Sequence, residues 1–199
     1  MKKAHRKNFE STVNKSAPRR CPLVAGPCNL NRSGPWPFRA SKRVPFAFIM
    51  RPYAAEFQDM EDISSEVLKS IGSISARNMS PGTVPEAGTQ ARMACVVAKD
   101  ESYVGAGLCQ ICELCQYAHF GIGELTGLNP NVVLEVGLMF ALAKPVVLTL
   151  NTARMGLSEI PFDFTGLLLV TYRNTKELRE GLKGKVTAVM AELRGRKLL

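Results

Sequence analysis

The hydrophobic positions between residues 119 and 151 predict a buried strand–helix–strand unit. Phe120–Leu125 is expected to be the first strand, and Val146–Leu150, a run of strand-forming residues, the next. Between them, residues 130–143 are apolar at almost every position, and a helix that is apolar all round is expected to be buried. Two strands with so long a connection are expected to be parallel, with a right-handed crossover.

One carboxylate interrupts this apolar helix. The helix is expected to begin at Asn129, a suitable N-cap, with Pro130 at the first helical position. Glu135 then lies on the same helix face as Asn131, close to the carboxyl edge of the sheet where open α/β folds bind ligands. Because a buried carboxylate is costly unless it is paired or used, Glu135 is our candidate site residue. The alternative is a structural ion pair, for example with Arg51.

The rest of the pattern alternates strands with helices. Five strands in such an alternation predict an α/β fold, a doubly wound, flavodoxin-like parallel sheet. A loop-like stretch, residues 72–90, interrupts the alternation and is either a flap over the site or an insertion. The other expected strands are Val44–Met50, Arg92–Ala98 and Leu167–Tyr172, the expected helices are Ala54–Ile71, Gly107–Tyr117 and Lys176–Leu193, and Thr152–Phe164 is expected to be a loop.

Charge divides the chain into two parts. Residues 1–43 hold eleven Lys and Arg against one acid, whereas the remainder holds fifteen against sixteen, so the net charge of +9 belongs to the leader. We expect a basic, mostly irregular extension over residues 1–43 and one folded domain over residues 44–199. We expect the extension to be a solvated tail, and nucleic-acid binding by it is the less favoured alternative. No apolar stretch follows the basic start and no apolar run could span a bilayer, so we expect a cytoplasmic protein without membrane contact.

Six cysteines in such a protein are expected to be thiols or metal ligands rather than disulfides. Cys109, Cys112 and Cys115 follow one another at steps of three along an expected helix. With Cys21 or Cys28 as a fourth ligand they would suit zinc, and the bound metal would attach residues 1–43 to the folded domain. The alternative, which we favour, is that they are small core side chains, and we expect no metal and no cofactor.

One long motif resembles a known family. The segments ELTGLNPNVVLEVGL (residues 124–138) and ALAKPVVL (residues 141–148) resemble the signature of TIR-like nucleotide-binding proteins, which are relatives of the nucleoside 2-deoxyribosyltransferases. Shorter flanking segments, FIMRPY (48–53), VAKD (97–100) and IPFD (160–163), are similar to weaker parts of the same pattern. The resemblance covers roughly residues 44–193.

The resemblance implies chemistry at an N-glycosidic bond. Glu135 matches the helical glutamate that attacks the anomeric carbon of a nucleoside, where a carboxylate stabilises or captures an oxocarbenium-like centre. The ligand would be a nucleoside, a nucleotide or NAD, with free N–H groups at the helix start suited to a phosphate. Related transferases complete their sites across subunits, so a homo-oligomer is also implied. The implied ligand-binding residues are Arg51, Pro52, Tyr53, Asp100, Glu124, Thr126, Asn129 and Asn131.

Two residues depart from the family pattern. Glu124 stands where the family has an aspartate, and Asn129 stands where the transferases carry an acid, which leaves Asp100 and Glu124 as candidates for the general acid. Simpler roles are an exposed loop carboxylate for Glu124, a helix cap for Asn129 and a packing residue for Tyr53. Two functions follow: cleavage or transfer at the glycosidic bond, or a nucleotide-sensing module without turnover.

Overall fold

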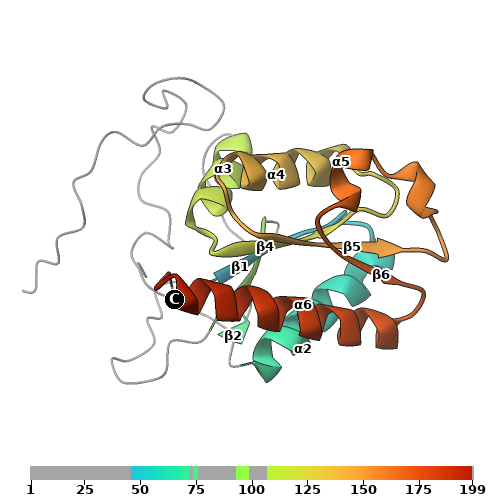
Figure 1. The fold of residues 1–199 in the computed structure, drawn as a ribbon. Coiled ribbons are helices and arrows are strands. Elements are labelled where there is room, and N and C mark those ends of the chain that lie inside the picture. The colour runs from blue at the N-terminus through green and yellow to red at the C-terminus, as the bar shows by residue number, and fades with distance from the viewer. Residues whose placement is uncertain (1–45, 72–73, 76–92, 99–106, 199) are drawn as a thin grey trace, which may run out of the picture.

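The protein folds around one parallel β-sheet covered by helices on both faces (Figure 1). The structure is a computed structural model, and it describes residues 46–71, 74–75, 93–98 and 107–198. The sheet has six strands in the order β2-β3-β1-β4-β5-β6, and every neighbouring pair is parallel. The strands are β1 (Phe46–Met50), β2 (Ile74–Ser75), β3 (Ala94–Val97), β4 (Phe120–Glu124), β5 (Val146–Asn151) and β6 (Leu168–Tyr172).

The five strands expected from the hydrophobic pattern are confirmed, and their spatial order is that of a flavodoxin-like sheet. The two-residue strand β2 was not predicted, because it lies within residues 72–90, which were expected to be a loop. The expected loop Thr152–Phe164 contains two short helical turns, η4 (Leu157–Glu159) and α5 (Phe162–Thr165). The basic segment 1–43 lies outside the described residues.

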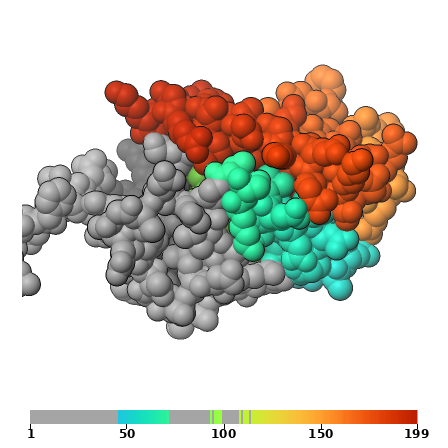
Figure 2. Space-filling model, turned by 90° about the horizontal axis from the view of Figure 1, so that it is seen from below, coloured from blue at the N-terminus to red at the C-terminus, as the bar shows by residue number. Residues whose placement is uncertain are grey.

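Two layers of helices enclose the sheet. On one face lie α2 (Gln58–Ser70), preceded by the short turn η1 (Ala55–Phe57), and α6 (Thr175–Gly195), and Figure 2 shows these two helices side by side. On the other face lie α3 (Gly107–Tyr117), α4 (Pro130–Ala141) and α5 (Figure 1). Strand side chains alternate between the faces, so each face has its own apolar core.

Helix α4 packs closely on β4 because of a glycine. A Cβ atom added at Gly123 would lie 2.8 Å from Cγ2 of Val136, which is closer than side chains tolerate. Glycine therefore lets α4 approach the strand directly, and Val136 is the sequence neighbour of Glu135. This contact fixes the height of Glu135 relative to the end of the sheet.

The prediction that α4 is buried all round is wrong. Its sheet-facing positions are buried, but Leu134 is 45% exposed and Gly137 and Ala141 are also exposed. The reason is the position of α4 in an outer layer, where neighbouring elements cover only its inner side. A mostly apolar composition therefore does not show how much of the helix surface other elements cover. No helix in the described part of the chain is both long and apolar enough to cross a membrane.

The topology creates a crevice between β1 and β4. The chain leaves β1 toward the face covered by α2, whereas it leaves β4 toward the face covered by α4. The two strands are neighbours, so their carboxyl ends diverge to opposite faces of the sheet. In open α/β folds this switch point is where ligands bind.

Candidate functional site

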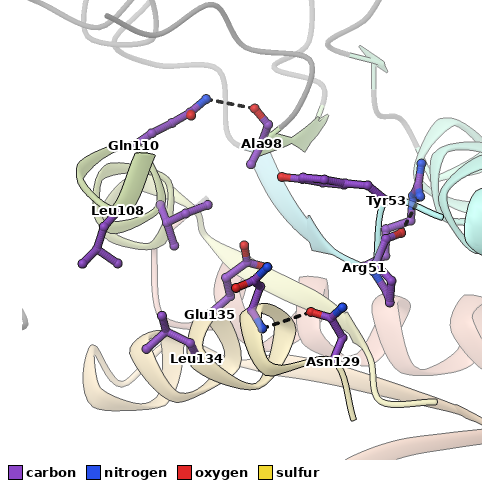
Figure 3. A pocket seen from close by; sticks show the side chains of 11 residues that line it. Arg51, Tyr53, Ala98, Leu108, Gln110, Asn129, Leu134 and Glu135 are labelled. Carbon is purple, nitrogen blue, oxygen red and sulfur yellow. Dashed lines mark hydrogen bonds between the residues drawn. The ribbon is translucent and has the colours of Figure 1, made fainter. Parts of the chain in front are cut away.

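A pocket of about 320 Å³ occupies the crevice between the ends of β1 and β4 (Figure 3). It brings together Arg51, Pro52 and Tyr53, which follow β1, with Asn129, Asn131 and Glu135 at the start of α4. These six were predicted site residues. The full lining is Arg51, Pro52, Tyr53, Ala98, Leu108, Gln110, Ile111, Asn129, Asn131, Leu134 and Glu135.

Glu135 lines the pocket as a buried carboxyl group without a partner among the described residues. The residue is 7% exposed, and its side chain makes no hydrogen bond or ion pair with any residue that the structure describes. In Figure 3 it points from α4 into the space between α3 and the end of β1. Burial raises the pKa of Glu135 to about 8, because the charged form loses its water. The alternative of an ion pair with Arg51 is not what the structure shows.

We expect the buried carboxyl of Glu135 to make stability depend on pH. Between its ordinary value of 4.5 and about 8, the folded protein keeps a proton that the unfolded chain has lost. The free energy of unfolding contributed by Glu135 is therefore fully present below about pH 4.5 and declines as the pH rises through 8. Glu135→Gln removes this decline. The free energy of unfolding of the variant minus that of wild type should therefore be larger at pH 9 than at pH 5, by more than about 1 kcal/mol. Urea unfolding at the two pH values measures it, and parallel pH profiles would contradict it.

The guanidinium of Arg51 is hydrogen-bonded to other groups of the protein. Its Nε donates to the buried carboxylate of Glu61 over 2.7 Å, and a second guanidinium nitrogen forms an ion pair with the same oxygen. It also donates to Gln58 over 2.8 Å and to the carbonyl of Pro52 over 2.7 Å. Arg51 thus shapes the pocket wall while its charge is balanced by Glu61, which lies one turn into α2.

Glu124 does not line the pocket. It is fully buried, so its simpler interpretation as an exposed loop carboxylate is wrong. It accepts hydrogen bonds from the N–H and the hydroxyl of Thr126, from Thr149 over 2.7 Å and from Tyr172 over 2.9 Å. Burial outweighs these bonds and raises the pKa of Glu124 above its ordinary value. The network ties the ends of β4, β5 and β6 to the loop that leads into α4.

Asn129 is the N-cap of α4, as predicted. Its side-chain oxygen accepts from the backbone N–H groups of Asn131 over 3.0 Å and Val132 over 3.4 Å. Pro130 has no N–H, and the N–H of Val133 donates to the carbonyl of Asn129 over 3.0 Å. The free N–H groups expected for a phosphate at this terminus are therefore occupied by the protein itself.

Two substitutions at Asn129 test its capping role at the start of α4. Asn129→Ala should lower the free energy of unfolding by about 1 kcal/mol, whereas Asn129→Ser should retain most of it. Asn174→Ala is a matched control, because Asn174 caps α6 in the same way and does not line the pocket. Urea unfolding measures all three. Equal losses for Asn129→Ala and Asn129→Ser would contradict the capping role.

Thr126 lies on a second cavity, which we call the rim cavity. It has a volume of about 620 Å³ and adjoins the pocket, since Pro52 and Asn129 line both. Asp100, the remaining predicted ligand-binding residue and candidate acid, lies outside the described residues.

The pocket wall formed by α3 was not predicted. Gln110 donates to the carbonyl of Ala98 over 2.9 Å, which ties α3 to the end of β3 (Figure 3). Leu108 and Leu134 face the same opening from α3 and α4. The available signal was topological: β3 is the neighbour of β1, so the helix that follows β3 borders the same crevice.

Two cysteines of the expected stripe are buried thiols. Cys112 and Cys115 belong to the core beneath α3, and the Cys115 thiol lies 3.8 Å from the backbone carbonyl oxygen of Glu135. Burial raises the pKa of the Cys115 thiol, which disfavours the thiolate that metals bind. Among the described side chains, no group of three or more His, Cys, Asp or Glu could hold a metal ion. Cys21, Cys28 and the side chain of Cys109 lie outside that part of the chain.

No family model, curated protein or solved structure matches this chain. The resemblance to the TIR-like and deoxyribosyltransferase-like proteins therefore stays a prediction.

Proposed function

We propose that the protein binds a nucleoside in the pocket and cleaves or transfers its N-glycosidic bond, with Glu135 as nucleophile. The observation that carries the proposal is the Glu135 carboxyl, which is buried and without a partner among the described residues in a crevice where such folds bind ligands. Structural carboxylates of this protein have partners, as Glu61 and Glu124 do.

In the proposed step, an oxygen of ionised Glu135 forms a bond to the anomeric carbon of the sugar. The bond from that carbon to the base nitrogen breaks, and its electron pair leaves with the base, which takes up a proton. Water or a second base then attacks the anomeric carbon and releases Glu135. Because Glu135 must be ionised to attack, the rate should rise as the pH approaches its pKa of about 8.

The charges of the pocket favour a neutral nucleoside over a nucleotide. Arg51 is the cationic side chain of the described lining, and Glu61 already balances its charge. The N–H groups at the start of α4 are capped by Asn129. A phosphate would therefore find no unused positive charge among the described lining residues, whereas a sugar hydroxyl can pair with the side-chain amide of Asn131.

The second candidate is a sensing module that binds the same ligand without turnover. The observation that favours it is the raised pKa of Glu135, which keeps most of the carboxyl neutral at pH 7. A neutral carboxyl is a hydrogen-bond donor rather than a nucleophile.

A base-release assay distinguishes the two candidates. Purified protein is incubated at pH 7 and pH 8.5 with NAD and with a panel of nucleosides and nucleotides, and free base is read by chromatography. Release from nucleosides that is faster at pH 8.5 supports the enzyme. Absence of release at both pH values, with a nucleoside still raising the melting temperature, supports the sensing module.

A further inference from the structure

The rim cavity is a second concave surface beside the pocket, with an apolar floor. Phe57 and Met155 are 7% and 8% exposed, and they form this floor together with Leu128 and Pro52. Its volume of about 620 Å³ falls within the range of small-molecule sites. Its remaining lining residues are Ala54, Glu56, Thr126, Gly127, Asn129, Pro130, Arg154 and Glu159.

One backbone donor on the lining of this cavity has a weak partner. The N–H of Gly127 donates to the thioether sulfur of Met155 over 3.2 Å, and a thioether is a poor acceptor. The loop carries two successive residues with positive φ, Gly127 at 77° and Leu128 at 46°. Such a conformation is uncommon for leucine and is often found at functional sites. A ligand nitrogen or oxygen could accept from this N–H in place of the sulfur, and only the weak bond to Met155 would be lost.

The charges on the rim disfavour an anion. Arg154 lies with its guanidinium carbon 5.0 Å from the centre of the Phe57 ring and pairs with Glu56 over 2.6 Å. Glu159 is a second carboxylate on the same lining. One oxygen of Glu159 accepts from the backbone N–H of Gly156 over 2.6 Å, and one oxygen of Glu56 accepts from Arg154. The second oxygen of each carboxylate has no donor among the described residues, so the cavity suits a neutral ligand that has donors of its own.

We propose that the rim cavity binds a flat nitrogen heterocycle that carries an amino group, such as an aminopurine base. The heterocycle stacks on the guanidinium of Arg154, donates its amino hydrogens to Glu56 or Glu159, and accepts from the N–H of Gly127. This inference extends the proposed function, because the two cavities share Pro52 and Asn129 and a two-part ligand could occupy both. It does not depend on turnover at Glu135.

The test is an NMR titration of the full chain with adenine, with the backbone amide of Gly127 as the reporter. Adenine should shift the Gly127 signal in a saturable way, and purine, which lacks the amino group, should bind at least about threefold more weakly. Arg154→Gln should weaken adenine binding by about five- to tenfold. Arg179→Gln should leave it unchanged, because Arg179 is an equally exposed arginine that pairs with Glu66 and does not line the rim cavity.

Three results would overturn the proposal: a Gly127 signal that adenine does not move, an Arg154→Gln variant that binds adenine like wild type, or a Gly127 signal that inorganic phosphate moves and adenine does not. Glu135→Gln separates this proposal from the proposed function. It should keep the adenine-induced shift of Gly127 whether or not it changes base release, so each proposal can fail alone.

Discussion

Glu135→Gln is expected to lower the rate of base release at least about a thousandfold while the protein still folds and binds its nucleoside. Glutamine keeps the shape of the side chain and can still hydrogen-bond in the pocket, but its amide cannot form the ester that the mechanism requires. Because Glu135 has no partner among the described residues, the substitution leaves no buried group unpaired there. Single-turnover rates of base release, measured beside ligand-induced melting shifts, separate chemistry from binding.

The matched control is Glu192→Gln. Glu192 is an exposed carboxylate on α6, paired with Arg196 and far from the pocket, so its substitution should leave the rate unchanged. A loss of less than about tenfold for Glu135→Gln would assign the chemistry to another group. An equal loss of rate and of ligand affinity would instead make Glu135 a binding residue rather than the nucleophile.

Arg51→Met should lower the free energy of unfolding by about 3–5 kcal/mol, because it leaves the buried carboxylate of Glu61 without its cation. The side chains of Arg51 and Glu61 are 0% and 2% exposed, so water cannot replace the lost partner. The double variant Arg51→Met with Glu61→Leu should recover most of this loss, because it removes both charges. Urea unfolding of wild type, both single variants and the double variant measures the coupling between the two residues.

The double variant also tests the predicted contact of Arg51 with the ligand. If Arg51 only shapes the wall, the refolded double variant should bind the nucleoside close to wild-type affinity. If the ligand contacts the guanidinium, affinity should fall although stability has returned. An Arg51→Met variant within about 1 kcal/mol of wild type would contradict the structural role of the ion pair.

The hydrophobic pattern was sufficient to predict the sheet. Runs such as Phe46–Met50 and Val146–Leu150 are apolar throughout because both faces of a parallel strand are covered. The same pattern placed Asn129 and Glu135 correctly at the carboxyl edge, since helix caps and strand ends are local features. The short strand β2 carries too few residues to produce a pattern of its own.

The polar partners could not be predicted, because they come from distant parts of the chain. Glu124 is bonded by hydroxyls of Thr149 and Tyr172, which are 25 and 48 residues away. The sequence around Glu124 resembles a ligand-binding motif, and nothing local shows that two further strands turn its carboxylate inward. Likewise, the pairing of Arg51 with Glu61 depends on how α2 packs, so the sequence alone left Arg51 available for Glu135 or for a ligand.

A direct measurement of the central claim is the capture of the glycosyl–enzyme ester. Protein is incubated at pH 8 with nucleosides whose sugar carries fluorine at carbon 2, and the intact mass is recorded. The fluorine destabilises the oxocarbenium-like transition state, so the ester, once formed, hydrolyses slowly and accumulates. The mass is expected to increase by one fluorinated sugar residue, located on the peptide that contains Glu135, and the increase should be absent from Glu135→Gln. Base release with no adduct on Glu135, or an adduct that persists in Glu135→Gln, would contradict this prediction.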